Sequence, residues 1–136
     1  MTKTITKWKQ NRVFESHMEH ENNPPGIIMD SDRKLGPGPK SLLLSAIAGC
    51  SGIDILDILD KKRIVYSDFS IDVEAEQTDE HPKVYKDIHI IYHIKTDAVN
   101  EDKIRKAIEL SLDKYCGVSA MLKKNSAIHY KLQLVQ

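Results

Sequence analysis

The sequence has little of several features that would point directly to a function. It has only two cysteines, Cys50 and Cys116, and they form no C-x-x-C pair of the kind found in zinc sites and dithiol redox motifs. Lysine and arginine together number 20, as do aspartate and glutamate, so the formal net charge is zero. Because no long-range field would attract nucleic acid or an anionic membrane, we expect neither as a partner.

Long apolar runs are also scarce. The stretch 1–10 is polar and contains three lysines, so it does not resemble a secretory signal. The longest apolar tract, 42–47, is interrupted by Ser45 and followed by Asp54, and it falls short of the roughly 20 residues that a membrane span needs. We therefore expect a cytoplasmic protein. In that reducing setting the two cysteines are expected to be catalytic, metal-binding or inert, and not a structural disulfide.

The length of 136 residues predicts one domain spanning 1–136, with no repeat or linker that would divide it. No phosphate-binding glycine loop and no Ser/His/Asp motif occurs, and we expect no cofactor and no metal. His89 and His93 lie too far apart along one extended strand to share a metal easily. Asp54, Asp57 and Asp60 have helical spacing and are interpreted as a solvated helix face.

Alternating apolar and polar residues predict strands. Three short ones are expected over 4–10, 13–20 and 27–30, and three longer ones over 69–75, 88–94 and 128–134. Each of the longer strands should have one buried face. The polar turn 78–82 predicts that the first two of them form an antiparallel hairpin.

The first of two predicted helices begins at residue 40 or 41 and ends near residue 61, after a rigid Gly-Pro-Gly-Pro loop at 36–39. Its first half has almost no polar face, so we expect burial on all sides and strands wrapped around it. Gly49 and Gly52 flank Cys50. Because glycine costs about 1 kcal/mol relative to alanine inside a helix, a close packing contact is expected there.

The second predicted helix spans about 101–115 and carries an apolar stripe. Asn100 is the expected N-cap, and Val99 and Ile104 are placed to form a hydrophobic staple. Cys116 follows at the end of this helix. On residue type alone, each cysteine is equally well explained as an inert core residue.

Two segments around the cysteines favour a chemical role. Residues 36–50 read GPGPKSLLLSAIAGC and residues 115–119 read YCGVS. These segments resemble the first-cysteine helix and the second-cysteine motif, C-x-V/I-S, of the OsmC/Ohr family. The order of strands and helices fits as well, so the resemblance covers nearly the whole chain.

The resemblance implies an α+β, OsmC-like fold, with antiparallel sheets around a long buried central helix, in an intertwined homodimer with active sites at the subunit interface. It also implies a thiol-dependent peroxidase that reduces organic hydroperoxides. In that reading Cys50 is the peroxidatic nucleophile and forms a sulfenic acid, and Cys116 resolves it as a disulfide that an external thiol reductant reopens. The sequence does not identify this reductant.

Family members with established peroxidase chemistry use an arginine and a glutamate beside the first cysteine, because burial in apolar surroundings suppresses the reactive thiolate. Arg12 is the best candidate for the arginine and Arg33 the second, with a solvated surface charge as the alternative for Arg12. Lys40 occupies the position of the glutamate, ten residues before Cys50. A lysine cannot accept the arginine's hydrogen bonds and repels it, although its ammonium could stabilise the Cys50 thiolate directly.

Apolar residues near the cysteines, namely Ala46, Ile47, Ile53 and Met121, are expected to line a site that favours apolar substrates. Two alternatives stay open. The chain could be a non-catalytic dimer of the same fold that binds a small apolar ligand, a reading that Lys40 favours. It could also be a redox sensor whose disulfide changes a protein contact.

Overall fold

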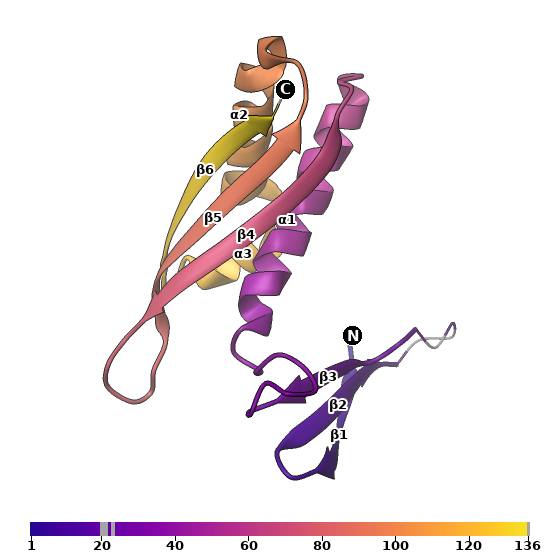
Figure 1. The fold of residues 1–136 in the computed structure, drawn as a ribbon, viewed down its shortest axis with the longest axis vertical. Coiled ribbons are helices and arrows are strands. Elements are labelled where there is room, and N and C mark those ends of the chain that lie inside the picture. Colours follow the sequence, from indigo (N-terminus) through magenta and orange to yellow (C-terminus); the bar gives the residue numbers. More distant parts are fainter. Residues whose placement is uncertain (20–21, 23, 136) are drawn as a thin grey trace. The chain divides into compact units, whose positions relative to one another are not determined.

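The computed structural model describes residues 1–19, 22 and 24–135 and shows an α+β protein with two three-stranded sheets. Its contacts group into two compact units, Met1–Leu43 and Leu44–Gln136, which we call the N-terminal and C-terminal units (Figure 1). Each unit is described by itself. The predicted end of the second strand, at His20, lies outside the described residues.

The N-terminal unit is an antiparallel sheet of β1 (Thr4–Gln10), β2 (Val13–Met18) and β3 (Ile27–Asp30), in that order. These strands confirm the three short ones predicted from the sequence. The Asp30 carboxylate accepts hydrogen bonds from the backbone amides of Asp32 at 2.9 Å and Leu35 at 3.1 Å. These bonds lower the pKa of Asp30 and hold the start of the loop that leads to the first helix.

The C-terminal unit is built on a sheet of β4 (Ser67–Gln77), β5 (Tyr85–Lys95) and β6 (Ala127–Val135). β4 and β5 form the predicted antiparallel hairpin, with Ile71 opposite Tyr92. β6 instead pairs with β5 in parallel, so the prediction of purely antiparallel sheets is wrong for this pair. The reason is topological: the chain between β5 and β6 forms a helical crossover, which returns β6 in the direction of β5.

Helix α1 (Leu42–Lys61) begins and ends close to its predicted limits. It lies along one face of the C-terminal sheet (Figure 1), and Ile47, Ile55 and Leu59 pack into the core of this unit. The opposite face is uncovered in the single chain, where Ala46 of the first half is exposed and Ile53 of the second half is 65% exposed. The prediction of burial on all sides is therefore wrong for one copy of the chain, because a single sheet can cover only one side of a helix.

The two glycines beside Cys50 differ. A Cβ added at Gly52 would lie 3.0 Å from Ile71 Cδ1 of β4, whereas one added at Gly49 would meet nothing within 4 Å. The predicted close contact is confirmed at Gly52 and is wrong at Gly49. The helix thus approaches the sheet closely one turn after Gly49, on its buried side.

α1 also departs from the expectation that no segment could match a membrane span. It has 20 residues and a mean hydropathy of 1.9 over its most apolar window, which is long and apolar enough for a span by composition alone. In the structure its apolar character serves the core, since Ile47, Ile55 and Leu59 are at most 1% exposed there.

The second helix is divided into several elements: a 3-10 turn (Ala98–Asn100), α2 (Glu101–Leu110), a π-helical turn (Ser111–Tyr115) and α3 (Gly117–Leu122). Asn100 precedes α2 but makes no capping bond, so the predicted N-cap is wrong. Its amide donates to Thr96 Oγ1 at 3.1 Å instead, and Asp97 caps the 3-10 turn. Because this turn moves the cap upstream, Val99 is 79% exposed and forms no staple.

Candidate functional site

The two cysteines come together in the C-terminal unit, although they are distant in sequence. Cys50 lies in the middle of α1 and is half-buried, and Cys116 lies at the start of α3 and is 3% exposed. Both are free thiols, and they lie close enough together for Cys50 to raise the pKa of Cys116. The fold therefore places a partly accessible sulfur directly beside a buried one.

The chain around Cys116 is held by a π-helical turn and a short helix. The Cys116 amide donates to the Ser111 carbonyl at 2.7 Å and closes the π turn. Its sulfur accepts a hydrogen bond from the Ser119 amide at 3.3 Å and so caps α3. The Ser119 hydroxyl donates a hydrogen bond to the Leu112 carbonyl at 2.9 Å. Single π turns occur frequently at functional sites, and here the turn places the Cys116 sulfur beside α1.

The environment of Cys116 keeps it protonated. Burial is the main cause that raises its pKa to about 11, and the hydrogen bond with Cys50 acts in the same direction. The Ser119 amide opposes the shift but does not overcome it. Cys116 is therefore a thiol at neutral pH. A reagent from solvent reaches the half-buried Cys50 more easily than the buried Cys116.

A partly buried hydrogen bond joins α1 to the segment that carries Cys116. The Ser111 hydroxyl donates to Asp54 Oδ2 at 2.9 Å, and Asp54 lies one helical turn after Cys50. Ser111 is completely buried, and Asp54 is half-buried. The interpretation of Asp54 as part of a solvated face is wrong, because its carboxylate is the acceptor that this buried hydroxyl requires.

A second buried pair connects α1 to β5. The hydroxyls of Ser51 and Tyr92 lie 2.8 Å apart, and Ser51 also donates to the Ile47 carbonyl at 2.8 Å. Tyr92 is fully buried, which raises its pKa to about 12, and Cys116 is close enough to contribute to that shift. This pair fixes the rotation of α1 on the sheet, and thereby the direction of the adjacent Cys50.

Sequence reasoning did not identify Ser51, Tyr92 or Ser111. One signal was available, because a tyrosine at an inward position of a buried strand needs a partner for its hydroxyl. Nothing in the sequence showed that the partner would be the residue that follows Cys50.

The three candidate cations belong to the N-terminal unit. Arg12 lies in the turn between β1 and β2 and is exposed, with Nη1 donating to the Asn11 carbonyl at 3.0 Å. Arg33 is exposed after β3, in a left-handed conformation with φ 59°. Lys40 is half-buried in the turn before α1, where its carbonyl accepts from the Leu43 amide at 3.1 Å. Their proposed roles toward Cys50 stay predictions.

The expected apolar lining is only partly available to a substrate. Ala46, Ile53 and Met121 are exposed, but Ile47 is 0% exposed and belongs to the core, so the prediction is wrong for Ile47. A hollow of about 570 Å³ begins at Asp54, one turn beyond Cys50, and also contacts Tyr115. Its wall is mixed in character, with two aspartates and two lysines as well as apolar side chains.

The histidines of the C-terminal sheet make surface contacts. His93 lies 2.9 Å from an Asp72 oxygen and His129 lies 3.0 Å from an Asp87 oxygen, while His89 stacks on His129 at 4.9 Å. Among the described residues, no group of three or more side chains is arranged to hold a metal ion.

A sheet packed against a long helix, with a pair of free thiols between that helix and a π turn, defines a small two-cysteine α+β protein. A family model described as OsmC-like protein matches residues 30–131 of the chain. The chain therefore belongs to the OsmC-like family, as the sequence motifs predicted.

Similar proteins agree with this assignment. Protein YhfA of Escherichia coli K12 is 30% identical over 132 residues, which cover 95% of each chain. The crystal structure of a hypothetical protein from Aquifex aeolicus VF5 is 28% identical with a TM-score of 0.80, covering 100% of this chain and 98% of that one. The organic hydroperoxide resistance protein OhrB of Bacillus subtilis shares the fold at 14% identity, with a TM-score of 0.65 and 98% coverage of both chains.

Proposed function

We propose that this protein is a thiol-dependent peroxidase that reduces organic hydroperoxides through a Cys50 sulfenic acid and a Cys50–Cys116 disulfide. The observation that carries the proposal is the contact between a half-buried thiol and a buried thiol held in the protonated form. The family relationship supports it, since OhrB of Bacillus subtilis is an organic hydroperoxide resistance protein.

The proposed chemistry needs both sulfurs. The Cys50 thiolate attacks the terminal peroxide oxygen, the O–O bond breaks, and the alkoxide leaves as an alcohol after taking up a proton. Cys50 is then a sulfenic acid. Cys116 loses its proton and attacks the Cys50 sulfur, so that water leaves and a disulfide forms. An external thiol reductant, the one co-reactant that the chain does not supply, reopens the disulfide by exchange.

The position of Cys116 suits the resolving step. Its sulfur needs no long movement, because Cys50 already lies close enough to raise the pKa of Cys116. Arg12, Arg33 and Lys40 remain the candidates for the cation that stabilises the Cys50 thiolate.

We propose a cytoplasmic homodimer as the working form. The uncovered side of α1 carries Ile53 at 65% exposure. Within the described part of the N-terminal unit, Val13 is the one buried apolar residue, whereas Trp8 is 63% and Phe14 is 40% exposed. A three-stranded sheet needs a covered apolar face for stability, and a second copy of the chain would supply that cover.

The test of the chemistry uses reduced protein and cumene hydroperoxide. Mass spectrometry should show the loss of two hydrogens from the chain and a peptide that links Cys50 to Cys116. The Cys116→Ser variant should stop at a Cys50 sulfenic acid that dimedone traps, and Cys50→Ser should not react. A folded protein whose Cys50 stays a thiol would contradict the proposal.

A second candidate function is a non-catalytic dimer that binds a small apolar ligand. The observation that favours it is Lys40 at the position of the family's glutamate. An apolar molecule that co-purifies with the wild-type chain and equally with Cys50→Ser would support this function. Reversible disulfide formation without turnover would instead indicate a redox sensor.

A further inference from the structure

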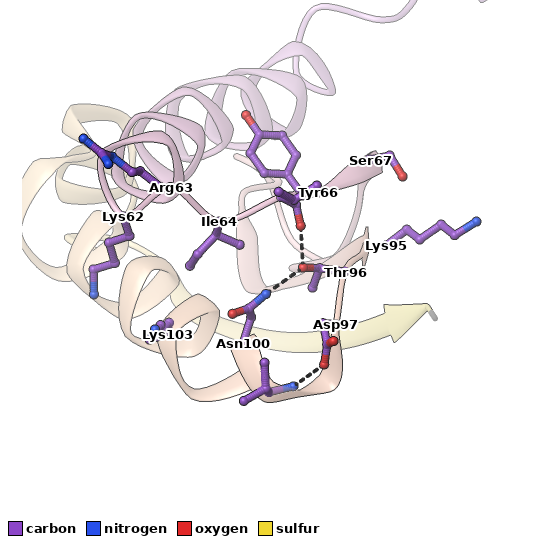
Figure 2. A pocket seen from close by; sticks show the side chains of 12 residues that line it. Lys62, Arg63, Ile64, Tyr66, Ser67, Lys95, Thr96, Asp97, Asn100 and Lys103 are labelled. Atoms are coloured by element: carbon purple, nitrogen blue, oxygen red, sulfur yellow. Dashed lines mark hydrogen bonds between the residues drawn. The ribbon is translucent and has the colours of Figure 1, made fainter.

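A groove of about 750 Å³ lies in the C-terminal unit at the end where α1 stops and α2 starts. Its wall comes from the chain between α1 and β4, the end of β5 and the 3-10 turn that leads into α2 (Figure 2). Its size is within the range of about 300 to 1,000 Å³ that is typical of small-molecule sites. We call it the basic groove because most of its charged side chains are cationic.

Four cations line the basic groove, namely Lys62, Arg63, Lys95 and Lys103, against one carboxylate, Asp97. This excess is local, because the whole chain has a formal net charge of zero. None of the four cations forms a salt bridge with any residue in the described part of the chain. Four cations with a single carboxylate among them repel one another, and a bound anion relieves that repulsion.

Several other polar groups of the wall already have hydrogen-bond partners. Thr96 donates to the Val65 carbonyl at 2.7 Å and accepts from the Asn100 amide at 3.1 Å. An Asp97 oxygen accepts from the Val99 amide at 3.0 Å (Figure 2). The groups left to bind a ligand are therefore predominantly cationic donors, which fit phosphate or carboxylate oxygens.

Arg63 occupies a backbone position that glycine would normally fill. It has φ 57°, and the bonds from Arg63 N to the Asp60 carbonyl and from Ile64 N to the Leu59 carbonyl close the end of α1 as a Schellman motif. The position after the last helical turn in this motif is commonly glycine, because other residues are strained there. An arginine at this point places a guanidinium at the groove at the expense of backbone strain.

The cations are spread out and do not converge on one point. Figure 2 shows Lys62 and Arg63 extending from the end of α1 and Lys95 extending to the opposite side from the end of β5. The rim also carries two exposed apolar side chains, Val65 at 86% and Val99 at 79%. A single phosphate would contact only part of this surface, whereas a longer anion with an uncharged body would contact all of it.

We propose that the basic groove binds a small phosphorylated ligand that carries at least two phosphate groups, of the size of a nucleoside diphosphate. Lys62, Arg63, Lys95 and Lys103 bind the phosphates, and Val65 and Val99 contact the uncharged part. The site is separate from the thiol pair, since Lys62 lies 12 residues, or about 18 Å of helix at 1.5 Å per residue, beyond Cys50.

Isothermal titration calorimetry at low ionic strength tests the proposal with ADP, inorganic pyrophosphate and inorganic phosphate as probes. The full-length protein should bind ADP and pyrophosphate saturably and more tightly than phosphate. Removing two cations in Lys62→Ala/Lys103→Ala should weaken binding by about tenfold or more. The matched control is Lys106→Ala, since Lys106 is also an exposed lysine of α2 but does not line the groove.

Arg63→Gly separates binding from folding. The variant removes a cation and relieves the strain of the left-handed backbone conformation. Its affinity for ADP should therefore be lower than that of the wild-type protein, and its melting temperature should be higher. A merely structural role for Arg63 would leave binding unchanged.

Three results would overturn the proposal. One is the absence of saturable binding of both ADP and pyrophosphate to the wild-type protein. Another is an equal loss of affinity in Lys106→Ala and Lys62→Ala/Lys103→Ala. The third is binding only to vesicles of phosphatidylcholine with phosphatidylserine, which would assign the groove to a lipid surface. Disulfide formation by Cys50 and Cys116 is measured separately, and its outcome does not bear on this site.

Discussion

The distance between the two sulfurs depends on polar residues that take no part in the proposed chemistry. Asp54 accepts the hydrogen bond of the buried Ser111 hydroxyl, and the Ser111 carbonyl accepts that of the Cys116 amide. These two bonds form a chain from α1 to the segment that carries the second cysteine. Asp54 and Ser111 are therefore positioning residues.

Asp54→Ala should both destabilise the protein and slow disulfide formation. It leaves the Ser111 hydroxyl buried without its acceptor, which costs about 1 to 3 kcal/mol of unfolding free energy. The rate of the Cys50–Cys116 disulfide should fall, while alkylation of Cys50 continues at the wild-type rate. Urea denaturation and a stopped-flow peroxide assay provide the two measurements.

Asp54→Asn and Asp57→Ala are the matched variants for this prediction. The asparagine keeps an acceptor oxygen and should restore most of the disulfide rate. Asp57 lies on the same helix but is exposed, so its removal should have little effect on either measurement. An equal effect of Asp54→Ala and Asp57→Ala would contradict the positioning role.

The raised pKa of Cys116 predicts how stability depends on pH. Its ordinary value is 9.0 and its folded value is about 11, so the folded state keeps this proton longer than the unfolded chain does. The contribution of the Cys116 thiol to the free energy of unfolding is complete below about pH 9. It is lost as the pH rises toward about 11, because the unfolded chain then releases the proton more readily than the folded state. Urea denaturation across this range should show a falling free energy of unfolding.

Cys116→Ser isolates the contribution of that thiol. The decrease in the free energy of unfolding between pH 9 and 11 should be smaller in the variant, since serine does not titrate there. The part of the decrease that comes from Tyr92 and other groups should persist. An unchanged slope would show that Cys116 is not the group responsible.

At the level of elements, the contact between α1 and the C-terminal sheet is set by a small residue. Gly52 allows the helix to approach β4 so closely that a Cβ would lie 3.0 Å from Ile71 Cδ1. This close approach brings Ser51 within hydrogen-bond distance of Tyr92, at 2.8 Å, and so orients Cys50. The close packing at Gly52 and the hydrogen bond between Ser51 and Tyr92 thus stabilise the same position of α1 on the sheet.

Gly52→Val should push the helix away from the sheet. The added side chain overpacks a filled contact, and we expect a loss of about 1 to 3 kcal/mol in unfolding free energy. Gly49→Val makes the same change where a Cβ meets nothing within 4 Å of the single chain, so the loss should be smaller. Thermal denaturation compares the two variants, and equal stabilities would contradict this account of the contact.

At the scale of the whole molecule, the uncovered apolar side chains favour association of two copies. Ile53→Lys introduces a charge on the exposed side of α1, where Ile53 contributes little to the fold of a single chain. Because a buried unpaired charge is costly, the variant should shift the proposed dimer toward monomer while its melting curve stays cooperative. Analytical ultracentrifugation measures the shift, with Val65→Lys as a control away from α1.

A wild-type protein that sediments as a monomer at micromolar concentration would exclude the dimer. Sedimentation of both lysine variants as wild-type dimers would show that the second copy covers another face.

Much of the fold followed from local pattern. The alternation in 88–94 predicted a strand whose Ile88, Ile90 and Tyr92 are buried, and β5 confirms this. The apolar composition of 42–50 predicted α1, but it could not show which side the sheet would leave open. The parallel pairing of β6 with β5 was missed, because alternation in one strand carries no information about the direction of its neighbour.

The sequence by itself determined the family, the two cysteines as the candidate site and the limits of most elements, because motifs, periodicity and turn residues are local properties. Tertiary structure decided which residues hold the sulfurs together. Ser51 and Tyr92, like Asp54 and Ser111, become partners only when α1 packs against the sheet and the π turn. The basic groove also arises in this way, since its four cations come from segments that only folding brings to one end of the C-terminal unit.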